Sequence, residues 1–180
     1  EAAANQIYDS MVDFAKYAFN KSHAACYATL AYYSAYLKCH YAEQYMSSLL
    51  TSVLDRPDKV MAYINECTRM GIKVLSPDVN ESEKTFSAKD GNIRFGLLAI
   101  KNVGESFAQH IADKRKESKY KSFEDFLTRI SDKEINKRMI ESLIKAGAFD
   151  SLGRKRRQIM ATYEDAIDAL QRRNRANVQG

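Results

Sequence analysis

The sequence lacks tryptophan and holds only three cysteines, two prolines and seven glycines among its 180 residues. Cys26, Cys39 and Cys67 are odd in number and widely spaced, and they show neither a disulfide framework nor a zinc-binding pattern. We therefore expect buried, reduced thiols in a cytoplasmic protein. No apolar run approaches the length of a membrane span, and the first residues lack the basic and apolar regions of a signal peptide. We accordingly expect no membrane association.

What is present has a globular balance, with 45% hydrophobic and 28% charged residues. A chain of this length can form one sizeable core or two or three small modules. It begins at Glu1 rather than at an initiator methionine, so we expect a fragment of a longer protein.

The positive charge is concentrated in the second half of the chain. Residues 1–100 carry 10 Lys and Arg against 11 Asp and Glu, whereas residues 101–180 carry 18 against 12. A basic half beside a neutral half indicates a polyanionic partner on one side of the protein. Solvated basic helices produce the same statistic, so the charge alone leaves both interpretations open.

Residues 5–54 contain neither Gly nor Pro, and they hold eight of the eleven tyrosines. This composition predicts two long packed helices, over residues 5–17 and 22–54, with a break in the second near His40.

Another helix is predicted over residues 58–70, where Gly71 ends it. Residues 72–97 change character, because short apolar runs alternate with polar turns and Asp90-Gly91-Asn92 is typical of a tight hairpin turn. From residue 97 the sequence returns to short helices with brief polar connections. The predicted fold is therefore mainly α with a small β element.

The segment over residues 98–111 resembles the helix-hairpin-helix motif, because an apolar stretch meets a glycine-containing turn and a helix follows. In this motif, backbone amides at the start of the second helix bind a DNA phosphate, since unpaired amides and the positive end of the helix dipole favour an anion. Asn102 stands where the motif usually has glycine, and asparagine is the next most tolerant residue at positive φ. The predicted DNA contacts in this hairpin are Lys101, Asn102, Val103, Gly104 and Glu105.

A second segment of the same kind covers residues 143–154. Gly147 and Gly153 are placed to end a helix and to form a turn. The four cations at 154–157 then sit at a predicted helix start, where the dipole disfavours them. This placement indicates an external anion, although a solvated basic turn gives the same pattern. Two such hairpins on the basic half predict non-specific binding of duplex DNA, here through Lys145, Gly147 and Arg154.

A different cluster lies at residues 19–24, Phe-Asn-Lys-Ser-His-Ala, before an apolar and tyrosine-rich run. In an unbroken helix, Asn20 and His23 share one face. In a helix that begins here, Asn20 or Ser22 is the N-cap, and the free amides join Lys21 in facing an anion. Either geometry admits the phosphate of a nucleotide, and a capped helix without any ligand gives the same pattern.

Taken in order along the chain, these stretches resemble the bacterial DNA polymerase III alpha subunits, the family C replicative polymerases. The blocks that carry the resemblance are residues 19–24, 36–38, 70–75, 77–80, 94–97, 99–101, 136–138 and 141–150. The chain departs from the family at Ala42 and Ser76, which replace proline, and at Asn102, which replaces the hairpin glycine.

The resemblance implies different roles for the two halves of the chain. It places the fingers in the first half, where the nucleotide-facing residues are Asn20, Lys21, Ser22 and His23. Lys21 is expected to contact the triphosphate of the incoming deoxynucleoside triphosphate, and His23 to pack near its sugar. The basic half corresponds to the tandem helix-hairpin-helix that holds the primer–template duplex. The Mg²⁺ ligands belong to the palm, outside this chain, so we assign no catalytic residue, metal ligand or cofactor here.

The predicted domains are a helical fingers subdomain, a small β connector, a tandem helix-hairpin-helix DNA-binding domain and a basic flexible tail, over residues 1–71, 72–97, 98–170 and 171–180. The longer protein is expected to be a cytoplasmic DNA-directed DNA polymerase, a nucleotidyltransferase of DNA replication that contacts the sliding clamp and other replisome subunits. The isolated chain is expected to be inactive. The alternative is a stand-alone, non-enzymatic helix-hairpin-helix protein of repair or recombination, which leaves the cluster at 19–24 unexplained.

Overall fold

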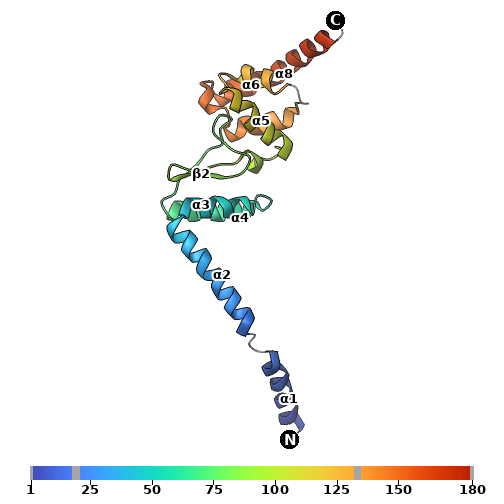
Figure 1. Ribbon diagram of the computed structural model, residues 1–180. Coiled ribbons are helices and arrows are strands. Elements are labelled where there is room, and N and C mark those ends of the chain that lie inside the picture. Colours follow the sequence, from blue (N-terminus) through green and yellow to red (C-terminus); the bar gives the residue numbers. More distant parts are fainter. Residues whose placement is uncertain (1, 18–20, 132–134, 179–180) are drawn as a thin grey trace. The chain divides into compact units, whose positions relative to one another are not determined.

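The computed structural model describes residues 2–17, 21–131 and 135–178, and it is mostly helical with one small sheet, which confirms the predicted fold class (Figure 1). The chain divides into two compact units, Glu1–Ala42 and Glu43–Gly180. The subdomain boundaries predicted after residues 71 and 97 fall inside the second unit and remain predictions. None of the helices in the described part of the chain is long and apolar enough to cross a membrane.

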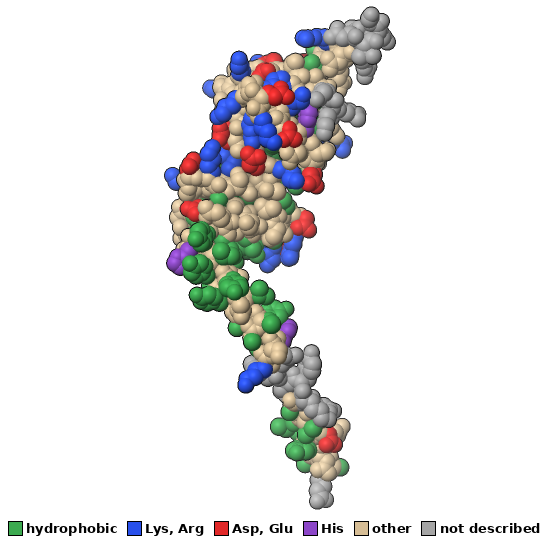
Figure 2. Space-filling view, in the orientation of Figure 1, with side chains coloured by type: hydrophobic (Ala, Val, Ile, Leu, Met, Phe, Trp, Pro, Cys, Tyr) green, Lys and Arg blue, Asp and Glu red, His purple; other side chains and the backbone are tan. Residues whose placement is uncertain are grey.

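The first unit consists of helices α1 (Ala2–Tyr17) and α2 (Lys21–His40). The predicted break near His40 is confirmed, because α2 ends there and α3 (Ala42–Thr51) forms a new helix. No residue of α2 is buried. Its large apolar side chains lie exposed along the helix, as Figure 2 shows: Tyr27, Leu30, Tyr32, Tyr33, Tyr36 and Leu37. The predicted helices are therefore present, but the expected packing of α2 is not found within this unit.

The second unit starts with α3 and α4 (Pro57–Arg69), and α4 ends as predicted at Gly71. Gly71 has a φ of 76°, its N–H donates to the carbonyl of Thr68, and the Ile72 N–H donates to the carbonyl of Cys67. This pair of bonds is the Schellman arrangement, which satisfies carbonyls at the helix end. The expectation of buried thiols holds for Cys67 alone, because Cys26 and Cys39 on α2 are exposed.

A three-stranded sheet follows, formed by β1 (Val74–Leu75), β2 (Ser87–Lys89) and β3 (Asn92–Arg94). The strand order is β1-β3-β2, with β1 parallel and β2 antiparallel to β3. The predicted tight turn is confirmed, since Asp90 and Gly91 have φ values of 52° and 73°. A two-residue hairpin loop with both φ values positive matches the right-handed twist of its strands.

The rest of the unit is helical, with short 3₁₀ turns η1 and η2 among the α-helices. In chain order the elements are η1 (Leu97–Ala99), α5 (Glu105–Glu117), α6 (Phe123–Arg129), α7 (Lys137–Ala146), η2 (Asp150–Leu152) and α8 (Arg156–Val178). The flexible tail predicted over residues 171–180 stays a prediction, and in its described part the chain is helical, because α8 continues through Val178. Both α6 and α7 pack against α8, whose side chains Ile159, Tyr163 and Ile167 are buried in the core.

The main core lies among these helices and is built around aromatic rings. Phe149 meets Phe123 and Phe126 edge-on, with ring centroids 5.1 and 4.9 Å apart. Tyr120 packs on Phe126 at 5.0 Å, and the Arg129 guanidinium lies 4.5 Å from the centre of the Tyr120 ring. Burial raises the pKa of Tyr120 to about 12. The edge-on geometry is the favourable one for aromatic quadrupoles, so these contacts contribute beyond their buried area.

Gly96 marks a place where two backbone segments approach too closely for a side chain. A Cβ added at Gly96 would lie 2.7 Å from the nitrogen of Phe86 and 2.8 Å from the Cα of Thr85. Because backbone cannot move aside as a flexible side chain can, we predict that Gly96→Ala lowers the free energy of unfolding by about 1–3 kcal/mol. Urea unfolding followed by circular dichroism measures this change.

The matched control is Gly104→Ala. Gly104 has a φ of −79°, and no neighbouring atom lies within 4 Å of an added Cβ. We expect this substitution to change the free energy of unfolding by less than about 0.5 kcal/mol. If both variants lose the same free energy of unfolding, the backbone of Gly96 does not lie as close to Thr85 and Phe86 as the structure places it.

Candidate nucleic-acid interface

The loop between β1 and β2, residues 76–86, is organised by its own polar side chains. The Asn80 N–H donates to Asp78 Oδ1 at 2.7 Å, and the Ser82 N–H donates to the Asp78 carbonyl at 2.8 Å. The Ser82 hydroxyl, fully buried, accepts from the Asp78 N–H at 2.9 Å and donates to the Phe95 carbonyl at 2.8 Å. Such side-chain bonds to nearby backbone replace water in a turn that is partly buried.

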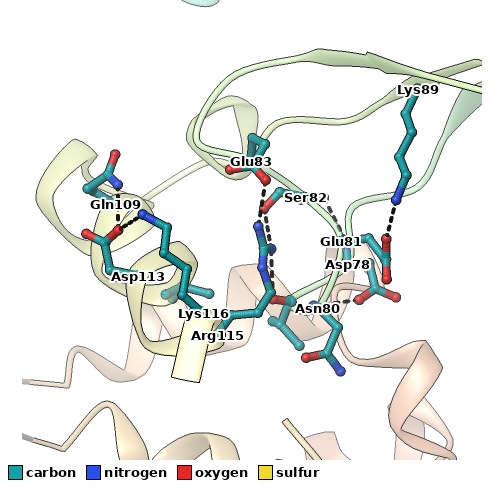
Figure 3. Close-up of polar contacts among 12 residues, drawn as sticks. Asp78, Asn80, Glu81, Ser82, Glu83, Lys89, Gln109, Asp113, Arg115 and Lys116 are labelled. Carbon is teal, nitrogen blue, oxygen red and sulfur yellow. Dashed lines mark hydrogen bonds and ion pairs between the residues drawn. The ribbon is translucent and has the colours of Figure 1, made fainter. Parts of the chain in front are cut away.

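Arg115 of α5 ties this loop to the first hairpin (Figure 3). Its guanidinium donates to the carbonyls of Val79 and Ser82 at 3.2 and 2.7 Å, and it pairs with Glu83 at 2.8 Å. The Arg115 side chain is only 12% exposed, so these bonds act in a partly desolvated setting. The planar guanidinium fits this cluster of acceptors because its donors point in fixed directions.

The same loop also contacts the second hairpin. The Asn80 side-chain amide donates to the carbonyl of Tyr120 at 2.9 Å, and Asn80 Oδ1 accepts from the Tyr120 N–H at 2.7 Å. Tyr120 lies between α5 and α6, so this pair of bonds adds to the hold on the end of α5. The Val79 N–H donates to the carbonyl of Ala148, which directly follows Gly147, at 2.9 Å. Since the Val79 side chain is itself fully buried, the loop fixes α5 and the turn after α7 against one core.

The first hairpin has the predicted backbone conformation. Asn102 adopts a φ of 66°, which confirms that it takes the left-handed conformation expected at the glycine position of the motif. The turn closes with a bond from the Val103 N–H to the Ile100 carbonyl at 3.1 Å, and α5 begins after Gly104. Its first arm is the 3₁₀ turn η1 rather than an α-helix. Glu105 pairs with Lys84 at 2.9 Å, and this hydrogen bond lowers the pKa of the Glu105 carboxyl.

A cleft of about 450 Å³ separates this hairpin from α7. Its lining includes Lys101 and Asn102 from the first hairpin and Glu141, Ser142 and Lys145 from α7, together with apolar side chains. The Asn102 side-chain amide donates to Ser142 Oγ at 2.9 Å. Lys145 also pairs with Glu141, one turn earlier on α7, at 2.6 Å. The structure therefore brings together Lys101, Asn102 and Lys145, three of the residues predicted to contact DNA.

The second hairpin is held by ion pairs between arginines and carboxylates that the sequence analysis did not predict. Gly147 has a φ of 86° and ends α7, as predicted, and a Cβ there would collide with the Arg156 guanidinium. Arg156 bonds to Asp150 at 2.8 Å, which lowers the pKa of that carboxyl. Arg154 pairs with Glu124 of α6. Two of the four consecutive cations thus have internal partners, which accounts for part of their placement without an external anion.

Gly147 and Arg154 are not among the residues that line the cleft. A DNA contact by either residue stays a prediction, as do the contacts of Val103, Gly104 and Glu105. Glu124 could not be paired with its arginine from spacing alone, because the Arg154–Glu124 pair joins residues 30 positions apart, whereas Asp150 and Arg156 are only six apart.

The predicted nucleotide residues lie in the first unit. Lys21, Ser22 and His23 form the exposed first turn of α2, which contains no acidic residue. Ser22 lies inside the helix, so it is not the N-cap, and Asn20 lies outside the described residues. The His23 ring contacts the Tyr27 ring at a tilt of 49°, with centroids 4.4 Å apart. The two predicted geometries differ at residues 18–20, which lie outside the described part of the chain, so both stay predictions.

Comparison with known proteins adds two findings. A family model described as a helix-hairpin-helix motif matches residues 71–159. The DNA polymerase III subunit alpha of Saccharopolyspora erythraea is 51% identical over 171 residues, which cover 94% of this chain and 14% of that protein. This chain belongs to the DNA polymerase III alpha subunit family, as one segment of it.

Other DNA polymerase III alpha subunits match this chain to a similar extent. That of Mycobacterium tuberculosis is 44% identical over 180 residues, or 99% of this chain, and that of Bacillus subtilis is 41% identical over 165 residues, or 92%. Each alignment covers 15% of the relative. The chain therefore spans about one seventh of the length of these alpha subunits, and the alignments include both structural units.

Proposed function

We propose that this segment binds duplex DNA without sequence preference, as part of a replicative DNA-directed DNA polymerase. The observation that carries the proposal is the cleft in which Lys101 and Lys145, from two different hairpins, line one surface. Phosphates are the same at every base pair, so cations and backbone amides that contact them give affinity but no sequence readout. The helix-hairpin-helix match and the relatives named as DNA polymerase subunits support the same conclusion.

The first unit is proposed to contribute the fingers and to contact the incoming deoxynucleoside triphosphate. The support is the exposed first turn of α2, where Lys21 provides a cation and helix amides point towards an anion. The adjacent His23 and Tyr27 rings offer an apolar surface of the kind that packs on a sugar or a base. Asn20, which we also assigned to this site, lies outside the described residues.

The remaining roles concern the longer polymerase and are proposals as well. They are nucleotidyl transfer with Mg²⁺ held outside this chain, contacts with the sliding clamp and other replisome subunits, a cytoplasmic location, and inactivity of the isolated chain. The alternative of a stand-alone repair or recombination protein is disfavoured by the alignments, which extend through the first unit as well as the hairpins.

Neutralising the two cleft lysines tests the DNA contact. We expect Lys101→Gln with Lys145→Gln to weaken the binding of a fluorescent duplex similarly for unrelated sequences. Because each lost phosphate contact removes about one unit from the slope of log affinity against log salt, that slope should flatten by about two units. Fluorescence anisotropy titrations between 50 and 200 mM salt, about the range in which such slopes are resolved, provide the measurement.

A charge-matched control replaces Lys59 and Lys73, which do not line the cleft, by glutamine. This variant has the same net charge as the first, so a general loss of positive field affects both equally. We expect the control to keep the original slope. If the two variants lose the same slope, the cleft is not the place where DNA phosphates bind.

His23→Ala tests the proposed contact with the nucleotide sugar. In the full-length polymerase that contains this segment, we expect the variant to incorporate ribonucleotides more readily relative to deoxyribonucleotides, by about fivefold, because a hydrogen-bonding or packing contact is worth about 1 kcal/mol. Single-nucleotide incorporation assays give the ratio of kcat/KM values. Lys38→Ala, on the last turn of α2, is the control. Unchanged discrimination in His23→Ala would remove the sugar role.

A further inference from the structure

The two hairpins are joined across the cleft by a hydrogen bond with a fixed direction. The Ser142 hydroxyl donates its one proton to the Arg138 carbonyl at 2.9 Å, in the preceding turn of α7. It therefore accepts from the Asn102 side-chain amide, which lies 2.9 Å away. The bond links residues 40 positions apart in the sequence, so it is a tertiary contact rather than a feature of either hairpin alone.

Backbone requirements do not explain why asparagine occupies position 102. A φ of 66° suits glycine best, since any side chain adds strain in the left-handed region. Asparagine accepts that strain and provides an amide that glycine lacks. In this structure the amide donates to Ser142 on α7, the first helix of the second hairpin.

The position of this bond relates it to the cleft lysines. Lys101 is the chain neighbour of Asn102, and Lys145 lies one helical turn beyond Ser142 on α7. All four residues line the same cleft. A bond between Asn102 and Ser142 therefore limits how far the two cations can separate, and a pair of cations held at fixed spacing loses less entropy on binding two phosphates.

We propose that Asn102 is a positioning residue that couples the two hairpins, so that Lys101 and Lys145 bind phosphates of one duplex together. The inference rests on the proposed DNA-binding function. It assigns to the Asn102 side chain a role in DNA affinity that acts through the spacing of the lysines and not through a phosphate contact of its own.

The test uses Asn102→Gly, Ser142→Ala and the double variant in the whole chain. Asn102→Gly keeps the backbone conformation and removes only the amide. We expect each single variant to weaken duplex binding by about fivefold, the effect of one ordinary hydrogen bond. The double variant should be no weaker than either single one, because both remove the same bond. The salt slope should stay unchanged, since no phosphate contact is lost.

Two further measurements separate positioning from mere stability. Ser142→Thr keeps a hydroxyl and should bind duplex DNA as the original chain does. Asn102→Gly should leave the thermal unfolding temperature nearly unchanged while it weakens binding, because relief of backbone strain offsets the lost hydrogen bond and the added entropy of the unfolded chain. A purely structural role would lower the unfolding temperature and the affinity together, and that result would overturn the proposal.

The proposed function and this inference fail in different ways. If neutralising Lys101 and Lys145 leaves duplex binding and its salt slope intact, the DNA-binding function itself is wrong. If the lysine variant behaves as expected but Asn102→Gly binds duplex DNA like the original chain, only the coupling role is wrong. Additive losses in the double variant would likewise overturn the coupling, because they would show that Asn102 and Ser142 act separately.

Discussion

Arg115 and the loop it binds determine the arrangement of the second unit. A partly buried loop needs partners for its backbone carbonyls, because an unsatisfied buried carbonyl costs free energy comparable to a lost hydrogen bond. Arg115 supplies donors to Val79 and Ser82, while Ser82 and Asn80 satisfy the neighbouring groups. The sheet, α5 and the turn after α7 all meet this loop. Their positions depend on one guanidinium and a few short polar side chains.

This constraint explains how residues of two hairpins come to line one cleft. The two hairpins are separate in sequence, and each alone presents one lysine near a turn. Because the loop holds both against a common core, Lys101 and Lys145 line one surface. Lys145 pairs with Glu141, and several other cations have carboxylate partners too, such as Arg154 with Glu124 and Lys137 with Asp168. The surplus of positive charge in the second half is thus less available to a partner than its count suggests, and its placement matters more.

Sequence reasoning succeeded where the backbone itself makes the demand. The left-handed conformations at Asn102 and Gly147 and the turn at Asp90-Gly91 follow from which residues tolerate positive φ. It failed where the decisive contact is distant, as with the Arg154–Glu124 pair and the Asn102–Ser142 bond. The helical end of α8 was missed as well, although arginine is a good helix former and the stretch from Gln171 contains three of them. Family resemblance alone predicts the nucleotide-facing residues, because nothing local to α2 distinguishes them from an ordinary helix start.

Native-state hydrogen exchange of the Val79 amide tests the central claim, that one loop holds both hairpins as a single body. This amide donates to the Ala148 carbonyl at 2.9 Å. If the loop and the hairpins open only together, Val79 should exchange with the same free energy as core amides of α7 such as that of Ile140, which reports the global unfolding of the unit. Rapid exchange at Val79 while Ile140 remains protected would show that the loop opens by itself, and it would contradict this account.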